Sequence, residues 1–237
     1  MDNTRGKFIV FEGIDGSGKT TQVHKLGTRM DFFEMDVDRT REASDGPIGR
    51  ILRDVYLSGK RKADPRIINY IYAADRLDHL TNEEDGIVKT LNRGIHVISD
   101  RYYMSSLAYY AMEFYGLETY DAEMKFILDF NQVNRDILEP DITFFIRLDP
   151  EVAMRRLMQY RGDLSIYETG EKLKRIAAAY EDAIRLLRAE GQNIFCIDGN
   201  LDENEILGIV CQKLDESGII PGISFASKMP EEWMRGS

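Results

Sequence analysis

Near the amino terminus, residues Gly13 to Thr20 have the types and the spacing needed to bind a polyphosphate. They read GIDGSGKT, which fits the pattern G-x-x-x-x-G-K-S/T, and they lie between a strand-like run and a helical pattern, as this motif requires. Glycine lets the backbone curl so that successive N–H groups point at phosphate oxygens. The following helix adds the positive end of its dipole. The segment is therefore predicted to be a P-loop.

The chemistry of a P-loop gives its last residues separate tasks. Lys19 is expected to bridge the β- and γ-phosphates of ATP, and the Thr20 hydroxyl is expected to ligate Mg²⁺. The residues predicted to hold the nucleotide are Gly13, Asp15, Gly16, Ser17, Gly18, Lys19, Thr20 and Thr21.

A second group of polar residues, Ser99 to Tyr102, follows the apolar run IHVIS. In an open α/β sheet, ligands gather outside the carboxyl ends of the strands. Asp100 is suited to hold a magnesium-bound water or to orient an acceptor, and Arg101 is suited to clamp a phosphate with two parallel hydrogen bonds. A plain surface ion pair at the end of a strand is the alternative reading of these residues.

The elements that would position these groups alternate along the chain. Apolar strand-like runs alternate with helical patterns, which predicts a three-layer α/β P-loop NTPase fold, a five-stranded parallel sheet flanked by helices. The expected strands are 7–12, a segment within 34–41, 95–99, 142–148 and 193–197. The expected helices are 19–30, 48–57, 65–80, 105–114, 121–138, one begun by Asp149 and Pro150, 168–190 and 202–217.

Length and composition limit the class of protein. The chain has 237 residues, two of them cysteine, and a formal net charge of −10. That charge argues against nonspecific binding to nucleic acid or to an anionic membrane. No apolar run approaches the roughly 18 residues that span a bilayer, and the amino terminus enters a strand without a signal-peptide pattern. Cys196 and Cys211 are too few for a disulfide framework. We therefore expect a cytoplasmic protein.

One domain is expected over residues 1–217, followed by a tail, 218–237, of unknown role. The tail carries several isoleucines and the only tryptophan, Trp233, and it either docks on the body or stays loose. A P-loop alone leaves the reaction open. The chain has no N-K-x-D guanine signature and is short for a motor ATPase, so a small-molecule kinase is favoured.

Several ordered segments between Lys7 and about Gly199 resemble the thymidylate kinase family. They are the opening strand and P-loop FIVFEGIDGSGKTTQ, the acceptor-phosphate segment TRE with PIGRILRDVYLSG, the base-binding helix YIYAADRLDH, the acceptor segment DRYYMSSLAYYA, and PDITFFIRLDPEVAMRRL, which leads into the lid. The resemblance implies transfer of a phosphoryl group from ATP to dTMP, with Mg²⁺, in deoxynucleotide synthesis. It also implies a homodimer and a small lid over about 155–168.

The resemblance assigns substrate-binding roles by position. Arg41 and Arg101 would hold the acceptor phosphate, with Asp100 beside them. Tyr72 would stack on thymine and Arg76 would donate to a base carbonyl; four residues apart, both lie on one helix face. Without the family, Tyr72 would be read as core and Arg76 as the partner of Asp75 or Asp78.

The same resemblance implies further roles around the sugar and the transferred phosphoryl group. Tyr109 would exclude a ribose 2′-hydroxyl, although by itself it reads as a packing aromatic. Ser105 and Ser106 fall where small polar groups line the base site. Asp15 would touch the acceptor sugar or the magnesium shell, or only stabilise its turn.

A catalytic arginine is expected from the lid, because the P-loop itself offers none. Arg161 is the first candidate, with Arg155 and Arg156 behind it; a solvated helix face is the plain alternative for all three. Together with Lys19, Asp15 and Arg101, it would complete the catalytic set, in which arginines contribute roughly 10³–10⁵ in rate.

Two departures from the family pattern keep other functions open. No proline follows Glu42, so the rigid turn of T-R-E-P-G-G-T is not carried over, and Leu164 to Glu168 reads LSIYE where the family has D-R-I-E. The alternatives are a P-loop kinase acting on uridylate, cytidylate or a free deoxynucleoside, and a weakly catalytic nucleotide sensor that binds partners through its tail.

Overall fold

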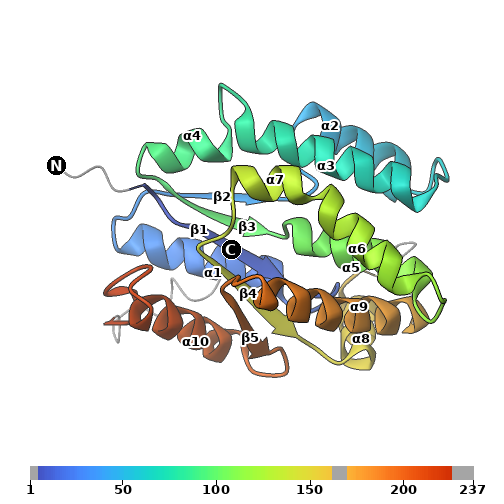
Figure 1. The fold of residues 1–237 in the computed structure, drawn as a ribbon. Coiled ribbons are helices and arrows are strands. Elements are labelled where there is room, and N and C mark those ends of the chain that lie inside the picture. The colour runs from blue at the N-terminus through green and yellow to red at the C-terminus, as the bar shows by residue number, and fades with distance from the viewer. Residues whose placement is uncertain (1–4, 162–169, 226–237) are drawn as a thin grey trace.

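The computed structural model of the protein describes residues 5–161 and 170–225, without the side chains of Tyr160, Arg161 and Phe225. Five parallel strands form one sheet in the order β2-β3-β1-β4-β5 (Figure 1). The strands are β1 (Phe8–Glu12), β2 (Val37–Arg41), β3 (His96–Asp100), β4 (Ile142–Arg147) and β5 (Ile194–Asp198). The predicted five-stranded parallel sheet is confirmed.

Helices cover both faces of the sheet (Figure 1). Their bounds are α1 (Lys19–Phe32), α2 (Pro47–Ile51), α3 (Pro65–Thr81), α4 (Ile87–Asn92), α5 (Tyr103–Ala111), α6 (Tyr120–Phe130), α7 (Gln132–Ile137), α8 (Pro150–Arg161), α9 (Gly170–Ala189) and α10 (Glu203–Glu216). A π-helix spans Leu52–Leu57, and single 3-10 turns span Met112–Phe114 and Ile223–Phe225.

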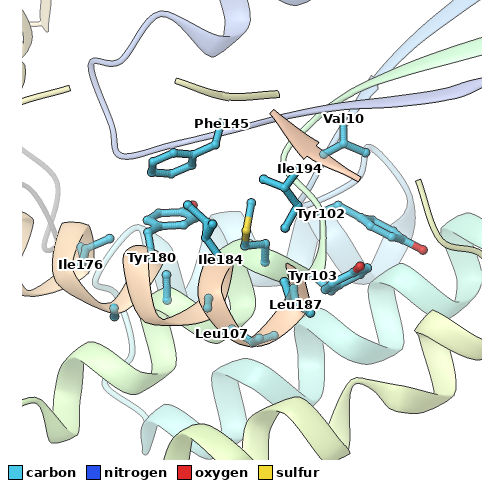
Figure 2. Close-up of a cluster of buried hydrophobic side chains, with 14 of the residues drawn as sticks. Val10, Tyr102, Tyr103, Leu107, Phe145, Ile176, Tyr180, Ile184, Leu187 and Ile194 are labelled. Carbon is cyan, nitrogen blue, oxygen red and sulfur yellow. The ribbon is translucent and has the colours of Figure 1, made fainter. Parts of the chain in front are cut away.

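The central strand β1 contributes to two separate cores because its side chains alternate between the faces of the sheet. Ile9 and Phe11 pack with α1 and α10. Phe8 and Val10 pack with α5 and α9 on the opposite face. Figure 2 shows this second face, where side chains of α9 point toward Phe145 of β4. Burial on both faces accounts for the continuous apolar run that identified the strand.

Most predicted elements are present, with shifted ends and some divisions. The helix predicted over 48–57 is α2 followed by the π-helix, and the one over 121–138 is divided into α6 and α7 at Asn131. Asp149 accepts a hydrogen bond from Glu151 N (2.7 Å) at the start of α8, as predicted from its capping position. The sequence did not predict α4, whose six residues are too few to show a helical period.

The first part of the tail docks on the body. Ile220 and Ile223 are buried against the core between the sheet, α1 and α10. Arg29 of α1 donates to Ile223 O (3.0 Å), and Gly222 N donates to Asp215 Oδ1 (2.8 Å). Trp233, the tryptophan of the tail, lies outside the described residues. Among the described helices, none combines the length and the apolar character needed to cross a bilayer.

Adjacent leucines of α9 test the packing of the core. Leu187 is 0% exposed, whereas Leu186 is 36% exposed. Leu187→Ala leaves a cavity and should lower the free energy of unfolding by about 2–5 kcal/mol. Leu186→Ala, the matched control, should lower it by less than about 1 kcal/mol. Urea denaturation followed by circular dichroism measures both changes, and equal losses would contradict the described packing of α9.

Candidate active site

The predicted P-loop links β1 to α1 in a conformation that requires glycine. Gly13, Gly16 and Gly18 have φ values of 148°, 81° and 96°, a region that L side chains rarely adopt. A Cβ at Gly16 would also lie 2.9 Å from Ala153 O. Lys19 turns back over the loop and donates to Ile14 O (2.8 Å). The loop is therefore curled as a polyphosphate cradle needs.

A cleft of about 870 Å³ lies over this loop. Of the residues predicted to hold the nucleotide, Asp15, Gly16, Ser17, Gly18, Lys19, Thr20 and Thr21 line it. Gly13 is not among the lining residues and instead begins the turn. Arg156 and Asn200 also line the cleft. Burial lowers the pKa of Lys19 to about 8, and repulsion by Arg101 acts in the same direction.

Thr20 and Asp100 meet at one side of the cleft. The Thr20 hydroxyl donates to Asp100 Oδ2, so the two predicted metal-binding residues are in direct contact. Asp100 Oδ1 is buried and has no hydrogen-bond partner among the described residues. An unsatisfied carboxylate oxygen beside a hydroxyl suits Mg²⁺, which is usually held by one or two carboxylates, phosphates and waters. Residues 5–161 and 170–225 contain no larger cluster of metal-binding side chains.

Arg101 is held by an extended hydrogen-bond network. Its Nη1 donates to Gly13 O (3.2 Å), Ser105 Oγ (3.0 Å) and the Tyr180 hydroxyl (3.1 Å). Its Nη2 donates to Asp15 and to the Tyr109 hydroxyl (3.1 Å). Its backbone has a φ of 77°, unusual for a residue with a side chain.

Asp15 completes this network from the P-loop. The Tyr109 hydroxyl donates to Asp15 Oδ2 (2.8 Å). Burial alone would raise the pKa of Asp15, but attraction by Arg101 and Lys19 outweighs it and lowers the pKa to about 2. Asp15 is therefore ionised at neutral pH, and it links the P-loop to Arg101.

Next to the P-loop cleft lies a cavity of about 340 Å³ between α3 and α5. Six of the residues predicted to bind the acceptor line it, and they are Arg41, Tyr72, Arg76, Arg101, Ser105 and Tyr109. Asp100, the seventh, lines the P-loop cleft instead. Ser106, also predicted there, lies in the same wall as Ser105.

Arg76 is almost completely buried, and its partner is Glu42. Its Nε and Nη2 donate to Glu42 Oε2 (2.8 and 2.5 Å), and its remaining bonds reach Asn131 Oδ1 (2.7 Å) and Ser106 Oγ (2.9 Å). The alternative expectation that an acid pairs with Arg76 is confirmed, but the acid is Glu42 rather than Asp75 or Asp78. Burial raises the pKa of Glu42 to about 7, against the attraction of Arg76.

Arg41 approaches from the end of β2 and is held loosely. Its side chain is 57% exposed and donates to Asp45 Oδ1 (2.7 Å), whose side chain is 72% exposed. An exposed ion pair of this kind contributes little free energy. A phosphate can therefore replace Asp45 as the partner of Arg41 at small energetic cost.

The segment after Glu42, which lacks the family's proline, is fixed by side chains. Ser44 N and Ser44 Oγ both donate to the Asp75 carboxylate (2.7 and 2.5 Å). Arg53 Nη1 donates to Ala43 O (2.5 Å) and also to Ser44 O. The turn is thus held by hydrogen bonds from α3 and the π-helix.

The two cavities meet in a narrow zone. Asp15, Arg41, Glu42 and Arg101 line both the P-loop cleft and the cavity beside α3. A polyphosphate on the P-loop and an anion in the second cavity would therefore face each other between guanidinium groups. This is the arrangement that in-line phosphoryl transfer requires.

Comparison with known proteins agrees with this geometry. A family model described as thymidylate kinase matches residues 11–207. The chain is 35% identical over 206 residues to a probable thymidylate kinase of Methanocaldococcus jannaschii, covering 85% of this chain and 94% of the relative. It is 33% identical over 223 residues to the thymidylate kinase of an Exiguobacterium species, covering 90% and 98%. The chain belongs to the thymidylate kinase family.

Three predicted arginines of the family's lid region differ in what the structure shows of them. Arg156 donates to Gly199 O (3.1 Å) and lines the P-loop cleft. Arg155 is exposed on α8. The side chain of Arg161 lies outside the described residues, as does the segment 164–168 where this chain departs from the family's D-R-I-E.

Sequence reasoning missed three residues that contact the site. Glu12 accepts hydrogen bonds from Ser105 Oγ and from the hydroxyl of Tyr180 on α9. Glu42 pairs with Arg76. The glutamate that ends the apolar run FIVFE was a usable signal, because a charged residue completing a buried strand calls for partners. Nothing in the sequence signals a role for Tyr180 in the site, because only the folding of the chain brings it close to Arg101.

The depressed pKa of Lys19 predicts opposite pH dependences of ATP binding and stability. Above pH 8 the free protein loses the Lys19 charge, so the affinity for ATP should fall by up to about tenfold per pH unit. The unfolded chain still binds that proton up to pH ~10.5, so Lys19 adds to stability as pH rises from 8 to that value. Calorimetric titration with ATP between about pH 7 and 9.5 measures the first effect.

Lys19→Arg is the control, because a guanidinium stays charged over this range. Its affinity for ATP should be nearly constant with pH, whatever its absolute value. A parallel decline in the two proteins would show that the Lys19 ammonium is not the titrating group.

Proposed function

We propose that this protein transfers the γ-phosphoryl group of ATP to dTMP, forming dTDP for deoxynucleotide synthesis. The observation that carries the proposal is the junction of two cavities at Asp15, Arg41, Glu42 and Arg101. Membership of the thymidylate kinase family supports dTMP as the acceptor. Neither the site nor the family favours a free deoxynucleoside, another pyrimidine nucleotide or a sensor role.

On the donor side, the backbone of the P-loop would hold the ATP phosphates, with Lys19 over the β- and γ-phosphates. Thr20 and Asp100 would hold Mg²⁺, directly or through water. Their contact and the unsatisfied Asp100 Oδ1 support this role. Bound there, Mg²⁺ would neutralise charge on the phosphates and orient them.

On the acceptor side, Arg101 and Arg41 would grip the dTMP phosphate. Arg41 would exchange its exposed partner Asp45 for the phosphate. The Nη hydrogens of Arg101 already have acceptors, so the phosphate would bind at its Nε–H or displace one of those acceptors. Tyr72 would stack on the thymine ring, and Arg76 would reach a base carbonyl. Four of the five Arg76 N–H groups are already engaged, so one remains on Nη1 for the base.

Around the sugar, Tyr109 would select deoxyribose. Its hydroxyl contacts both Asp15 and Arg101, so the ring is fixed at the wall of the cavity and would oppose a 2′-hydroxyl. Asp15 would in turn orient Arg101 and the acceptor sugar. Ser105, which lies on α5 like Tyr109, would support Arg101 by accepting its hydrogen bond.

A lid over about 155–168 would close the donor side and supply Arg161 to the transferred phosphoryl group. Arg156 lies in the P-loop cleft at the base of this segment, which supports a catalytic contribution from α8. Closure would also exclude water and limit hydrolysis of ATP. We further propose one kinase domain over 1–217, against which the first part of the tail packs through Ile220 and Ile223, in a cytoplasmic protein.

A homodimer is proposed through the outer face of α3, α6 and α7. Large apolar side chains are exposed there, namely Ile67, Tyr70 and Leu77 on α3, Phe126 on α6, and Val133 and Ile137 on α7. Tyr70 contacts Phe130 (ring centroids 4.7 Å apart), so the apolar surface is continuous from α3 to α6. A second copy of this face is the partner that the family implies.

An acceptor panel tests the activity. ADP release with ATP should be fastest with dTMP, slower with dUMP, UMP or CMP, and at background with thymidine or no acceptor. Arg101→Ala should lower kcat/KM for dTMP by about 10²-fold or more while ATP binding persists, because it removes acceptor contacts. Arg185→Ala, on an exposed arginine that pairs with Asp182, is the control and should be neutral.

A blank panel would refute the kinase proposal and support the sensor. Ribonucleotide preference would refute the role of Tyr109. Equal losses of ATPase and kinase activity in Arg101→Ala would place Arg101 on the donor side instead.

The dimer is tested by analytical ultracentrifugation. Val133 is 61% exposed on α7, and Val133→Asp should convert a dimer to a monomer because it places a charge in the apolar interface. Met158→Asp, on the similarly exposed Met158 of α8 (58%), should leave the dimer intact. A monomeric wild-type protein, or equal effects of the two changes, would refute this interface.

A further inference from the structure

A buried carboxylate lies at the end of the central strand. Glu12 closes β1, whose other residues, Phe8 to Phe11, are all apolar, and its exposure is 0% like theirs. Burying an ionised carboxylate is costly unless its oxygens receive hydrogen bonds. None of the roles derived above for the site uses Glu12, so its presence needs another reason.

One carboxylate oxygen of Glu12 caps α5. Glu12 Oε1 accepts from Tyr102 N (2.8 Å) and from Ser105 N (3.0 Å), two of the backbone donors at the start of that helix. The N-cap residue Tyr102 makes no such bond with its own side chain. Arg101 N donates to Phe11 O (2.9 Å), so β1 holds the backbone on both sides of the Arg101 side chain.

The other oxygen of Glu12 orients two hydroxyls. Glu12 Oε2 accepts from Ser105 Oγ (2.6 Å) and from the Tyr180 hydroxyl (3.0 Å). Arg101 Nη1 donates to the same two hydroxyl oxygens (3.0 and 3.1 Å). A hydroxyl has one proton, so while that proton points at Glu12 the oxygen presents only lone pairs to Arg101.

The two hydroxyls also lie 2.8 Å apart, and whichever donates to the other, the remaining proton points at Glu12. Glu12 therefore sets the polarity of the whole group. In each arrangement at least one proton points at Glu12 and neither points at Arg101, and Glu12 achieves this without pairing with the guanidinium itself. Glu42, by contrast, pairs directly with Arg76.

We propose that Glu12 and Tyr180 are positioning residues for Arg101, which they hold through hydroxyl oxygens in the direction needed to receive the acceptor phosphate. The inference rests on the proposed role of Arg101 in binding that phosphate. Nη1 is held by the hydroxyls and Nη2 by Asp15 and Tyr109, so both ends of the fork are fixed before the acceptor arrives. Such preorganisation reduces the free energy needed for ordering on binding.

Tyr180 allows this role to be separated from packing. Its ring lies in the core against Phe145 (ring centroids 5.2 Å apart), with Ile176 and Ile184 on the same side of α9 (Figure 2). Only its hydroxyl reaches Arg101 and Glu12. Tyr180→Phe therefore keeps the packed ring and removes one acceptor from the guanidinium.

The test compares Tyr180→Phe with Tyr103→Phe in the full chain. Tyr103 is also buried (2% exposed), but its hydroxyl donates to Gln192, away from Arg101. Tyr180→Phe should raise KM for dTMP about tenfold, the effect of one hydrogen bond to a charged group, and leave KM for ATP unchanged. Tyr103→Phe should change neither constant. Equal changes in the two variants, or equal rises in both KM values for Tyr180→Phe, would overturn the proposal.

Glu12→Gln supplies a second measurement that does not depend on turnover. The glutamine oxygen should keep the two backbone donors, because hydroxyls can rotate and these N–H groups cannot. Its NH₂ group then faces the two hydroxyls, whose protons turn toward Arg101. A crystal structure of this variant without ligands should show the Arg101 guanidinium displaced from Ser105 and Tyr180. An unmoved guanidinium would overturn the proposal, and if the variant does not fold, Tyr180→Phe decides. Wild-type turnover of dTMP tests the proposed function separately.

Discussion

The hydrogen bonds at the carboxyl end of β1 place both halves of the site. Phe11 O accepts from Arg101 N (2.9 Å), Glu12 accepts from Tyr102 N (2.8 Å), and the next residue, Gly13, begins the P-loop. One strand end thus holds the P-loop on one side and, on the other, Arg101, the residue proposed to bind the acceptor phosphate. Because β1 is central in the sheet and buried on both faces, the P-loop and Arg101 are both attached to a closely packed part of the molecule.

Charge is distributed so that each arginine suits a different partner. Arg76 is buried and paired with Glu42, so part of its charge is compensated before a ligand binds, which suits the hydrogen bond to an uncharged base proposed for it. Arg41 has only an exposed and weak partner, so its charge is available to an anion. The net charge of −10 therefore does not prevent phosphate binding. The immediate partners of each arginine, rather than the negative charge of the rest of the protein, decide whether its charge is available to a phosphate.

The sequence predicted the elements and residues whose signal is local. Strands buried on both faces are continuous apolar runs, and the P-loop needs glycines at fixed positions, so β1, β3, β4 and the residues 13–20 were readable. The helix α4 was not readable, because its six residues are too few to show a period. The edge strand β2 was predicted only as a segment within 34–41, without defined ends. The contributions of Tyr180 and Asn131 depend on tertiary contacts between distant elements, for which one sequence carries no pattern.

The segment after Glu42 shows how tertiary contacts can replace a local constraint. A proline would fix the backbone there through its ring, and this chain has Ala43 instead. The Asp75 carboxylate accepts hydrogen bonds from Ser44 N and Ser44 Oγ. Arg53 donates to the backbone carbonyls of Ala43 and Ser44. Asp75 directly precedes Arg76 on α3, so the helix that carries Arg76 also fixes the segment that carries Glu42, its partner. The turn and Arg76, the residue proposed to face the base, are therefore positioned by one helix, and the missing proline does not by itself loosen the cavity beside α3.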